Sequence, residues 1–177
     1  VAHMGGGISI GAHLHGKVVD VINALDGEGP MSPERTGRLP LMPVLDMLQT
    51  GQTSIDELRK TVLTRGGLFA HMGSNDLRKA VEKAEAGDGH AKLVLDALVY
   101  NISKEISGLA PCLFQDDHKP MDAVVLTGGM AHSAWLTERI QRLVSFLGQV
   151  VVIPGAMELE ALAAAGVVGL DSGAVAY

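Results

Sequence analysis

Two short apolar segments near the end of the chain constrain its fold most strongly. Residues 123–126 and 150–153 are continuously apolar, and a helical pattern over 133–146 separates them. Strands buried on both faces and joined through a helix pair in parallel, because the helix carries the chain back to the edge where the first strand began. The chain is therefore expected to be an α/β protein.

An alternating pattern at the start of the chain adds an antiparallel meander. Apolar residues occupy every second position from Ile8 to Leu14, as in a strand with one buried face. His15-Gly16 predicts a tight turn, residues 17–22 are expected to return as a strand, and residues 1–4 precede three glycines as a further strand. Together the segments predict a mixed five-stranded sheet flanked by helices. The helices are expected at 41–48, from a capping box at Ser54–Glu57, and at 75–86, 90–109, 133–146 and 158–170.

Composition and charge argue against several classes of protein. The 177 residues carry a net charge of −6 without a basic run, which argues against nucleic-acid binding. No apolar run reaches the roughly 18 residues of a membrane span, and nothing resembles a signal peptide, so the cytoplasm is the simplest compartment. Cys112, the only cysteine, is interpreted as a packing residue. The length indicates one domain, and because the chain opens in a predicted buried strand we expect a further segment before it.

Two glycine-rich bends are candidates for contact with a ligand. Gly5, Gly6 and Gly7 stand between predicted strands, where backbone N–H groups could approach a phosphate; a simple turn is the alternative. Thr127-Gly128-Gly129 follows the buried strand 123–126, at the end where ligands bind in α/β sheets; close helix–strand packing is the alternative. Gly11 to Lys17 has P-loop spacing, but Val18 replaces the required Ser or Thr, so we interpret it as a hairpin.

Charged side chains near these bends are candidates for catalysis. The Gly- and Pro-rich loop 26–43 carries Arg35 beside Glu34, and long irregular loops are commonly functional; a surface ion pair between the two is the alternative. His3 lies beside the first glycines, where a structural histidine is the alternative. Glu158 lies near the start of the last predicted helix, where an acidic residue also favours the helix dipole.

In combination these segments resemble the acetate kinase and butyrate kinase family, within the ribonuclease H-like, actin-like ATPase fold. Residues 1–9 are similar to the family's His-Leu-Gly-x-Gly-x-Ser segment, and residues 26–37 to the butyrate kinase version of its Gly-Thr-Arg-Ser-Gly loop. Residues 73–78, 126–133 and 154–160 resemble the nucleoside-contacting, adenosine and magnesium-associated segments. Glu34 and Gly6 favour butyrate kinase or a branched-chain carboxylate kinase, since acetate kinase would have Thr and Asn there.

The resemblance implies a reaction and a set of roles. The γ-phosphoryl group of ATP, with Mg²⁺, would pass to a short-chain fatty acid, giving an acyl phosphate and ADP. His3 and Arg35 would act on the transferring group, and Glu158 would orient Mg²⁺. The phosphates would be cradled by Gly5, Gly6 and Gly7. The nucleoside would be bordered by Asp76, Leu77, Arg78, Thr127, Gly128, Gly129 and Met130.

The resemblance also implies how the chain relates to a complete enzyme. Residues 1–177 would be the C-terminal nucleotide-binding domain of an acyl kinase whose N-terminal domain is absent, and the isolated chain would be inactive. A homo-oligomer, dimeric or larger, is implied, with neither nucleic acid nor membrane as a partner. Three alternatives stay open: a kinase for another carboxylate (acetate, propionate or a branched-chain acid), a sugar kinase of the same fold, and a nucleotide-binding or dimerisation module without turnover.

Overall fold

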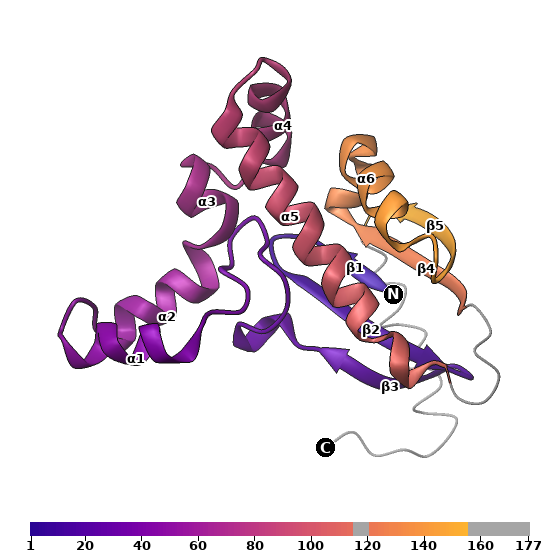
Figure 1. Ribbon diagram of the computed structural model, residues 1–177, viewed down its shortest axis with the longest axis horizontal. Coiled ribbons are helices and arrows are strands. Elements are labelled where there is room, and N and C mark those ends of the chain that lie inside the picture. Colours follow the sequence, from indigo (N-terminus) through magenta and orange to yellow (C-terminus); the bar gives the residue numbers. More distant parts are fainter. Residues whose placement is uncertain (115–120, 156–177) are drawn as a thin grey trace.

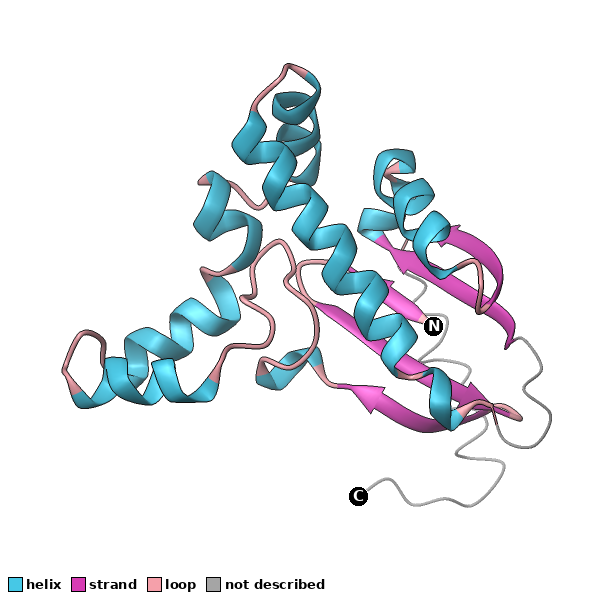
Figure 2. Ribbon diagram, in the orientation of Figure 1, coloured by secondary structure: helices cyan, strands magenta, loops and turns pink. Residues whose placement is uncertain are grey.

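A computed structural model describes residues 1–114 and 121–155, which form a mixed sheet with helices packed on it (Figures 1 and 2). The five strands lie in the order β3-β2-β1-β4-β5. They are β1 (Ala2–Met4), β2 (Ile8–Leu14), β3 (Lys17–Ile22), β4 (Met121–Gly128) and β5 (Gly148–Pro154). β1 pairs antiparallel with β2 and β2 with β3, whereas β1–β4 and β4–β5 are parallel. The predicted meander and parallel pair are both confirmed.

Helices make up most of the remaining described chain. They are η1 (Ala24–Asp26), α1 (Leu41–Gln49), α2 (Ile55–Thr64), α3 (Gly67–Met72), α4 (Leu77–Glu85), α5 (Gly89–Gly108), η2 (Ala110–Cys112), η3 (Gly129–His132) and α6 (Ala134–Val144). The helix predicted over 75–86 begins at Leu77, because the Asp76 side chain caps it. The short α3 has no counterpart in the predictions, since Gly66-Gly67 marks a break in the sequence. The helix predicted over 158–170 lies outside the described residues.

The core lies between one face of the sheet and helices α5 and α6, which run across it in Figure 1. The apolar stripe predicted on the long helix is buried as expected: Val94, Leu98, Ile102, Ile106 and Leu109. The alternating residues Ile8, Ile10 and Ala12 of β2 face the same core. Cys112 is partly buried and packs against it, in agreement with its predicted role.

Helices α1 and α2 form an arm that extends away from the sheet (Figure 1). Neither helix buries a residue. Ser54 caps α2 by accepting a hydrogen bond from the Glu57 N–H, as the predicted capping box requires. The Glu57 carboxylate instead pairs with Arg65 at 3.2 Å, so only half of the capping box forms. The arm therefore presents its side chains to its surroundings.

A candidate nucleotide site at the carboxyl ends of the strands

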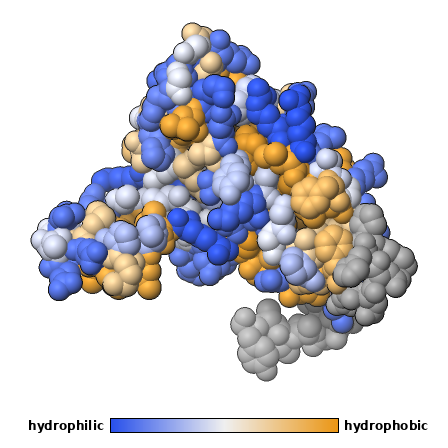
Figure 3. Space-filling view, in the orientation of Figure 1, coloured by the Kyte–Doolittle hydropathy of each residue, from blue (hydrophilic) through white to orange (hydrophobic). Residues whose placement is uncertain are grey.

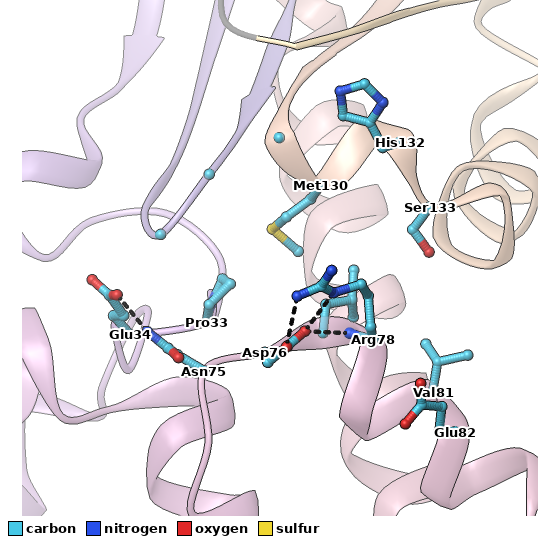
Figure 4. Close-up of a pocket in the computed structure, with 14 residues that line it drawn as sticks. Pro33, Glu34, Asn75, Asp76, Arg78, Val81, Glu82, Met130, His132 and Ser133 are labelled. Carbon is cyan, nitrogen blue, oxygen red and sulfur yellow. Dashed lines mark hydrogen bonds and ion pairs between the residues drawn. The ribbon is translucent and has the colours of Figure 1, made fainter.

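The two glycine bends emerge at the same edge of the sheet. β1 and β4 are parallel neighbours, with Ala2 opposite Leu126, so the chain leaves both strands in the same direction. The first bend begins at Gly5 and the second continues into Gly129 and Met130. Gly5, Gly129 and Met130 line one hollow of about 930 Å³ (Figure 4). Cavities that bind small molecules commonly measure ~300–1,000 Å³, so a nucleoside with part of its phosphates would fit here.

The two glycines of the second bend have different structural roles. Gly128 has φ +89° and ψ 177°, and a Cβ built on it would lie 2.5 Å from the Met4 carbonyl oxygen. Gly129 would meet nothing within 4 Å, and it lines the hollow. The packing alternative therefore accounts for Gly128, whereas Gly129 leaves space for a ligand.

Thr127 does not face the hollow either. Its Oγ1 donates a hydrogen bond to the Gly155 carbonyl oxygen at 3.2 Å, which ties the end of β4 to the end of β5. Thr127 and Gly128 were both predicted to border the nucleoside, and neither lines the hollow, because strand pairing and close packing occupy them. Of the four residues predicted here, Thr127 to Met130, Gly129 and Met130 border it.

The start of α4 forms the wall opposite this bend. Asp76 accepts a hydrogen bond from the Arg78 N–H and receives the guanidinium in two further bonds, Nε to Oδ1 at 3.1 Å and Nη2 to Oδ2 at 3.0 Å. These bonds lower the pKa of Asp76, so the carboxylate is ionised at neutral pH. Figure 4 shows Arg78 folded back over Asp76. Asp76, Leu77 and Arg78 all line the hollow, and their contact with a nucleoside stays a prediction.

A second hollow of about 550 Å³ lies on the other side of the first glycine bend. His3 and Arg35 line it together with Gly7, and Gly5 and Gly6 line both hollows. A Cβ on Gly7 would overlap the Arg35 guanidinium, and one on Gly5 would lie 3.7 Å from His3 Nε2. The glycine turn is thus a thin wall, with the imidazole and the guanidinium close on its far side.

Arg35 and Glu34 point to different places, so the surface ion pair considered for them does not form. Arg35 Nη1 donates to the Ala24 carbonyl oxygen at 2.6 Å, within the second hollow. Glu34 Oε1 accepts a hydrogen bond from Asn75 Nδ2 at 2.8 Å, within the first (Figure 4). Because adjacent side chains point in opposite directions, Glu34 lines the first hollow and Arg35 lines the second.

Several lining residues escaped prediction. Glu34 was weighed as a partner for Arg35 and as a residue that favours butyrate kinase, and Asn75 belongs to the segment 73–78 that resembles the nucleoside-contacting segment, but neither was predicted as a site residue. The other residues of the first hollow that were missed are Pro33, Val81, Glu82, His132 and Ser133. His132 and Ser133 lie two and three residues after Met130, and their place in the segment 126–133, which resembles the adenosine segment, was the available signal. Val81 and Glu82 carry no signal beyond lying one turn along α4 from Arg78.

The described residues suit a nucleotide better than a metal ion. Side-chain-free backbone and a nucleoside-sized hollow meet at one edge of the sheet. Within residues 1–114 and 121–155, no three His, Cys, Asp or Glu side chains gather where they could hold a metal. Glu158, the predicted magnesium residue, lies outside the described residues. Of the helices in those ranges, none has the length and apolarity needed to cross a membrane.

Solved structures share this architecture. The acetate kinase of Porphyromonas gingivalis superimposes with a TM-score of 0.81 at 21% identity, over 94% of this chain and 48% of that one. The propionate kinase of Francisella tularensis gives a TM-score of 0.77 at 24% identity, over 89% and 46% of the two chains. The fold is thus that of the actin-like ATPases, as predicted.

Sequence comparison narrows this class to one family. Residues 1–174 match the Acetokinase family, and the chain belongs to it. It is 51% identical over 168 residues to a probable butyrate kinase of Maridesulfovibrio salexigens. This match covers 94% of this chain and 46% of that protein. A probable butyrate kinase of Oleidesulfovibrio alaskensis is 49% identical over 171 residues, with the same coverage. The chain therefore spans about half the length of the curated relatives it matches.

Proposed function

We propose that this chain is the C-terminal, nucleotide-binding half of an ATP-dependent carboxylate kinase that converts butanoate and ATP to butanoyl phosphate and ADP. The observation that carries the proposal is the glycine turn that walls both hollows. On one side is room for a nucleoside, and on the other are His3 and Arg35. A phosphoryl group crossing at this turn would leave the nucleotide and meet its acceptor beside two hydrogen-bond donors.

The proposed reaction requires positioning and charge stabilisation, and it requires no general base. A carboxylic acid with a pKa near ~4 is ionised at neutral pH, so no general base is needed. One carboxylate oxygen forms a bond to the γ-phosphorus while the bond from that phosphorus to the β–γ bridging oxygen breaks, and ADP leaves with the electron pair. Catalysis then rests on positioning and on charge stabilisation. We assign the stabilisation to His3 and Arg35, and the cradle for the phosphates to Gly5, Gly6 and Gly7.

Butanoate is the proposed acid for two reasons. The relatives at 49–51% identity are named probable butyrate kinase. The second hollow also has an apolar side, formed by Val21, Ile22, Ala24 and Leu25, against which a short aliphatic chain would pack. ATP/ADP is the proposed nucleotide, with Mg²⁺ held partly through Glu158, and the cytoplasm is the compartment that this activity implies.

The full-length protein, meaning this chain with the preceding half that the proposal requires, provides the test. It is incubated with MgATP, hydroxylamine and one acid at a time: acetate, propanoate, butanoate, a branched-chain acid or a sugar. We expect acyl hydroxamate, the trapped acyl phosphate, to form fastest with butanoate. Faster reaction with another acid would reassign the substrate. ATP consumption with the sugar and none with any acid would refute carboxylate kinase activity.

A second candidate function follows from the length of the chain, which spans only 46% of its relatives. Expressed alone, it would be a nucleotide-binding module without turnover. Calorimetric titration with ADP and the hydroxylamine assay distinguish the two on this chain. ADP binding without acyl phosphate describes a module, and activity of this chain alone would show that the preceding half is dispensable.

We also propose that the protein is a homo-oligomer that associates through the arm formed by α1 and α2. Large apolar side chains are exposed along it, namely Leu41, Met42, Leu45, Met47 and Ile55, and Figure 3 shows hydrophobic atoms on its surface. Three acidic and three basic side chains between 39 and 66 cancel, although the whole chain has a net charge of −6. A two-fold interface sets one surface against itself, so a neutral arm avoids repulsion.

Replacing both Leu41 and Leu45 with Asp is expected to dissociate the oligomer. The carboxylates would have to lose water at the interface, and we expect the dissociation constant to rise ~100-fold or more. Light scattering after size exclusion would show the mass of a single protomer. Leu93→Asp is the control, since Leu93 is similarly exposed but lies on α5. An unchanged mass for the double variant would place the interface elsewhere.

A further inference from the structure

Ser32 joins the glycine turn to the loop that carries Arg35. Ser32 is fully buried, with 0% of its surface exposed. Its Oγ donates a hydrogen bond to the Gly6 carbonyl oxygen at 2.6 Å. Ser32 Oγ in turn accepts a hydrogen bond from the Arg35 backbone N–H at 3.0 Å and a longer one, of 3.4 Å, from the Glu34 backbone N–H. One hydroxyl therefore links the wall between the hollows to the residue on each side of it.

The backbone around Ser32 is also held from the side of α3. The Leu68 N–H donates to the Ser32 carbonyl oxygen at 3.1 Å, and the Gly66 N–H donates to the Glu34 carbonyl oxygen at 2.8 Å. Gly67 has φ +57°, and a Cβ there would overlap the Ser32 carbonyl oxygen. The loop is thus packed against α3 as closely as a backbone can approach. On the side of the glycine turn, the loop is held by two hydrogen bonds to the Gly6 carbonyl oxygen. The Ser32 hydroxyl donates one at 2.6 Å, and the Glu34 N–H donates the other at 3.2 Å.

We propose that Ser32 is a positioning residue for phosphoryl transfer, which sets the place of Arg35 relative to the glycine turn. This inference rests on the function proposed above. It needs no contact between Ser32 and the substrate, because the hydroxyl is buried and saturated by the turn and the loop. In-line transfer depends closely on geometry, and a misplacement of ~1 Å can cost ~100-fold in rate. Loss of the hydroxyl would free the Arg35 backbone to move by a distance of this order.

Three variants separate positioning from simple loss of a buried hydroxyl. Ser32→Ala removes the links, and Ser32→Cys keeps the volume with a weaker donor. Ser103→Ala is the matched control, because Ser103 is also buried (5% exposed) and its Oγ has no hydrogen-bond partner within the described residues. If Ser32→Ala does not fold, Ser32→Cys carries the same comparison.

In the full-length protein, we expect Ser32→Ala to lower kcat about 10- to 100-fold while the nucleotide Kd changes less than about threefold. Ser32→Cys should lie between, and Ser103→Ala should match the wild type. In a chain that already carries Arg35→Ala, the Ser32→Ala change should have no further effect, because Ser32 acts through Arg35. A kcat within twofold of the wild type, or effects that multiply in the double variant, would overturn the proposal.

Amide hydrogen exchange tests the link without relying on turnover. The Arg35 N–H donates to Ser32 Oγ, so it should exchange faster in Ser32→Ala than in the wild type or Ser103→Ala. Equal exchange in all three would show that Ser32 does not position Arg35, whatever the rates. Faster exchange in a protein that phosphorylates no acid would refute the proposed function while supporting the positioning of Arg35.

Discussion

Arg35→Ala is expected to lower kcat for acyl-phosphate formation by ~10³-fold or more in the full-length protein, as for other arginines that stabilise a transferring phosphoryl group. The side chain lies in the second hollow, with its guanidinium against Gly7 and its Nη1 bonded to the Ala24 carbonyl oxygen. The nucleoside would occupy the first hollow, which Arg35 does not line. The nucleotide Kd should therefore change less than about tenfold.

Three further variants test whether the loss of turnover is specific to the hydrogen-bond donors of the second hollow. His3→Ala, which removes the other donor of the second hollow, should also reduce kcat while leaving nucleotide affinity within about tenfold. Arg35→Lys keeps the charge but loses the planar fork, so it should recover only part of the rate. Arg142→Ala, an exposed arginine on α6, is the control and should retain full activity. Unchanged turnover in both His3→Ala and Arg35→Ala would refute their assigned roles.

Gly128→Ala is expected to lower the free energy of unfolding by about 2–4 kcal/mol, from backbone strain and overpacking. Gly128 has φ +89° with ψ 177°, a region that only glycine commonly occupies. Its new Cβ would also press on the Met4 carbonyl oxygen at 2.5 Å, where β4 ends beside β1. Thermal unfolding of the full-length protein, which is about twice as long as this chain, should shift down by roughly 3–5 °C.

Gly129→Ala provides the matched comparison one residue along the chain. No atom lies within 4 Å of the position its Cβ would take, so stability should change by less than about 0.5 kcal/mol. The methyl group would instead enter the first hollow, and the nucleotide Kd should rise. Calorimetric titration and thermal unfolding of both variants test the pair. Equal unfolding temperatures for the two variants would contradict the packing role of Gly128.

Local sequence patterns predicted the sheet and much of the core. The alternation of Ile8, Ile10 and Ala12 fixed which face of β2 is buried, because side chains in a strand alternate in direction. The parallel pairing expected for β4 and β5 brought the second glycine bend to the carboxyl edge of the sheet, where the first bend also emerges. Gly5 and Gly129 meet at one hollow because β1 also pairs in parallel with β4, a contact that the local patterns did not predict.

Contacts between distant segments could not be predicted in the same way. Two adjacent glycines, Gly128 and Gly129, look alike in sequence, and only the approach of Met4 separates their duties. Helix α3 depends on Gly67 fitting against the Ser32 carbonyl oxygen, so its local sequence signals a break instead. Glu34 was expected beside Arg35, yet Asn75, 41 positions along the chain, draws it to the other hollow.

The turn that both hollows share has an evolutionary consequence. On the proposed assignment, the hollow that receives the acid can be reshaped at positions such as Val21 and Leu25, which do not line the first hollow. Substitutions there could change the length or branching of the accepted acid while ATP recognition stays intact. Descendants of a single ancestor could in this way diverge in their acids and keep a common phosphoryl donor.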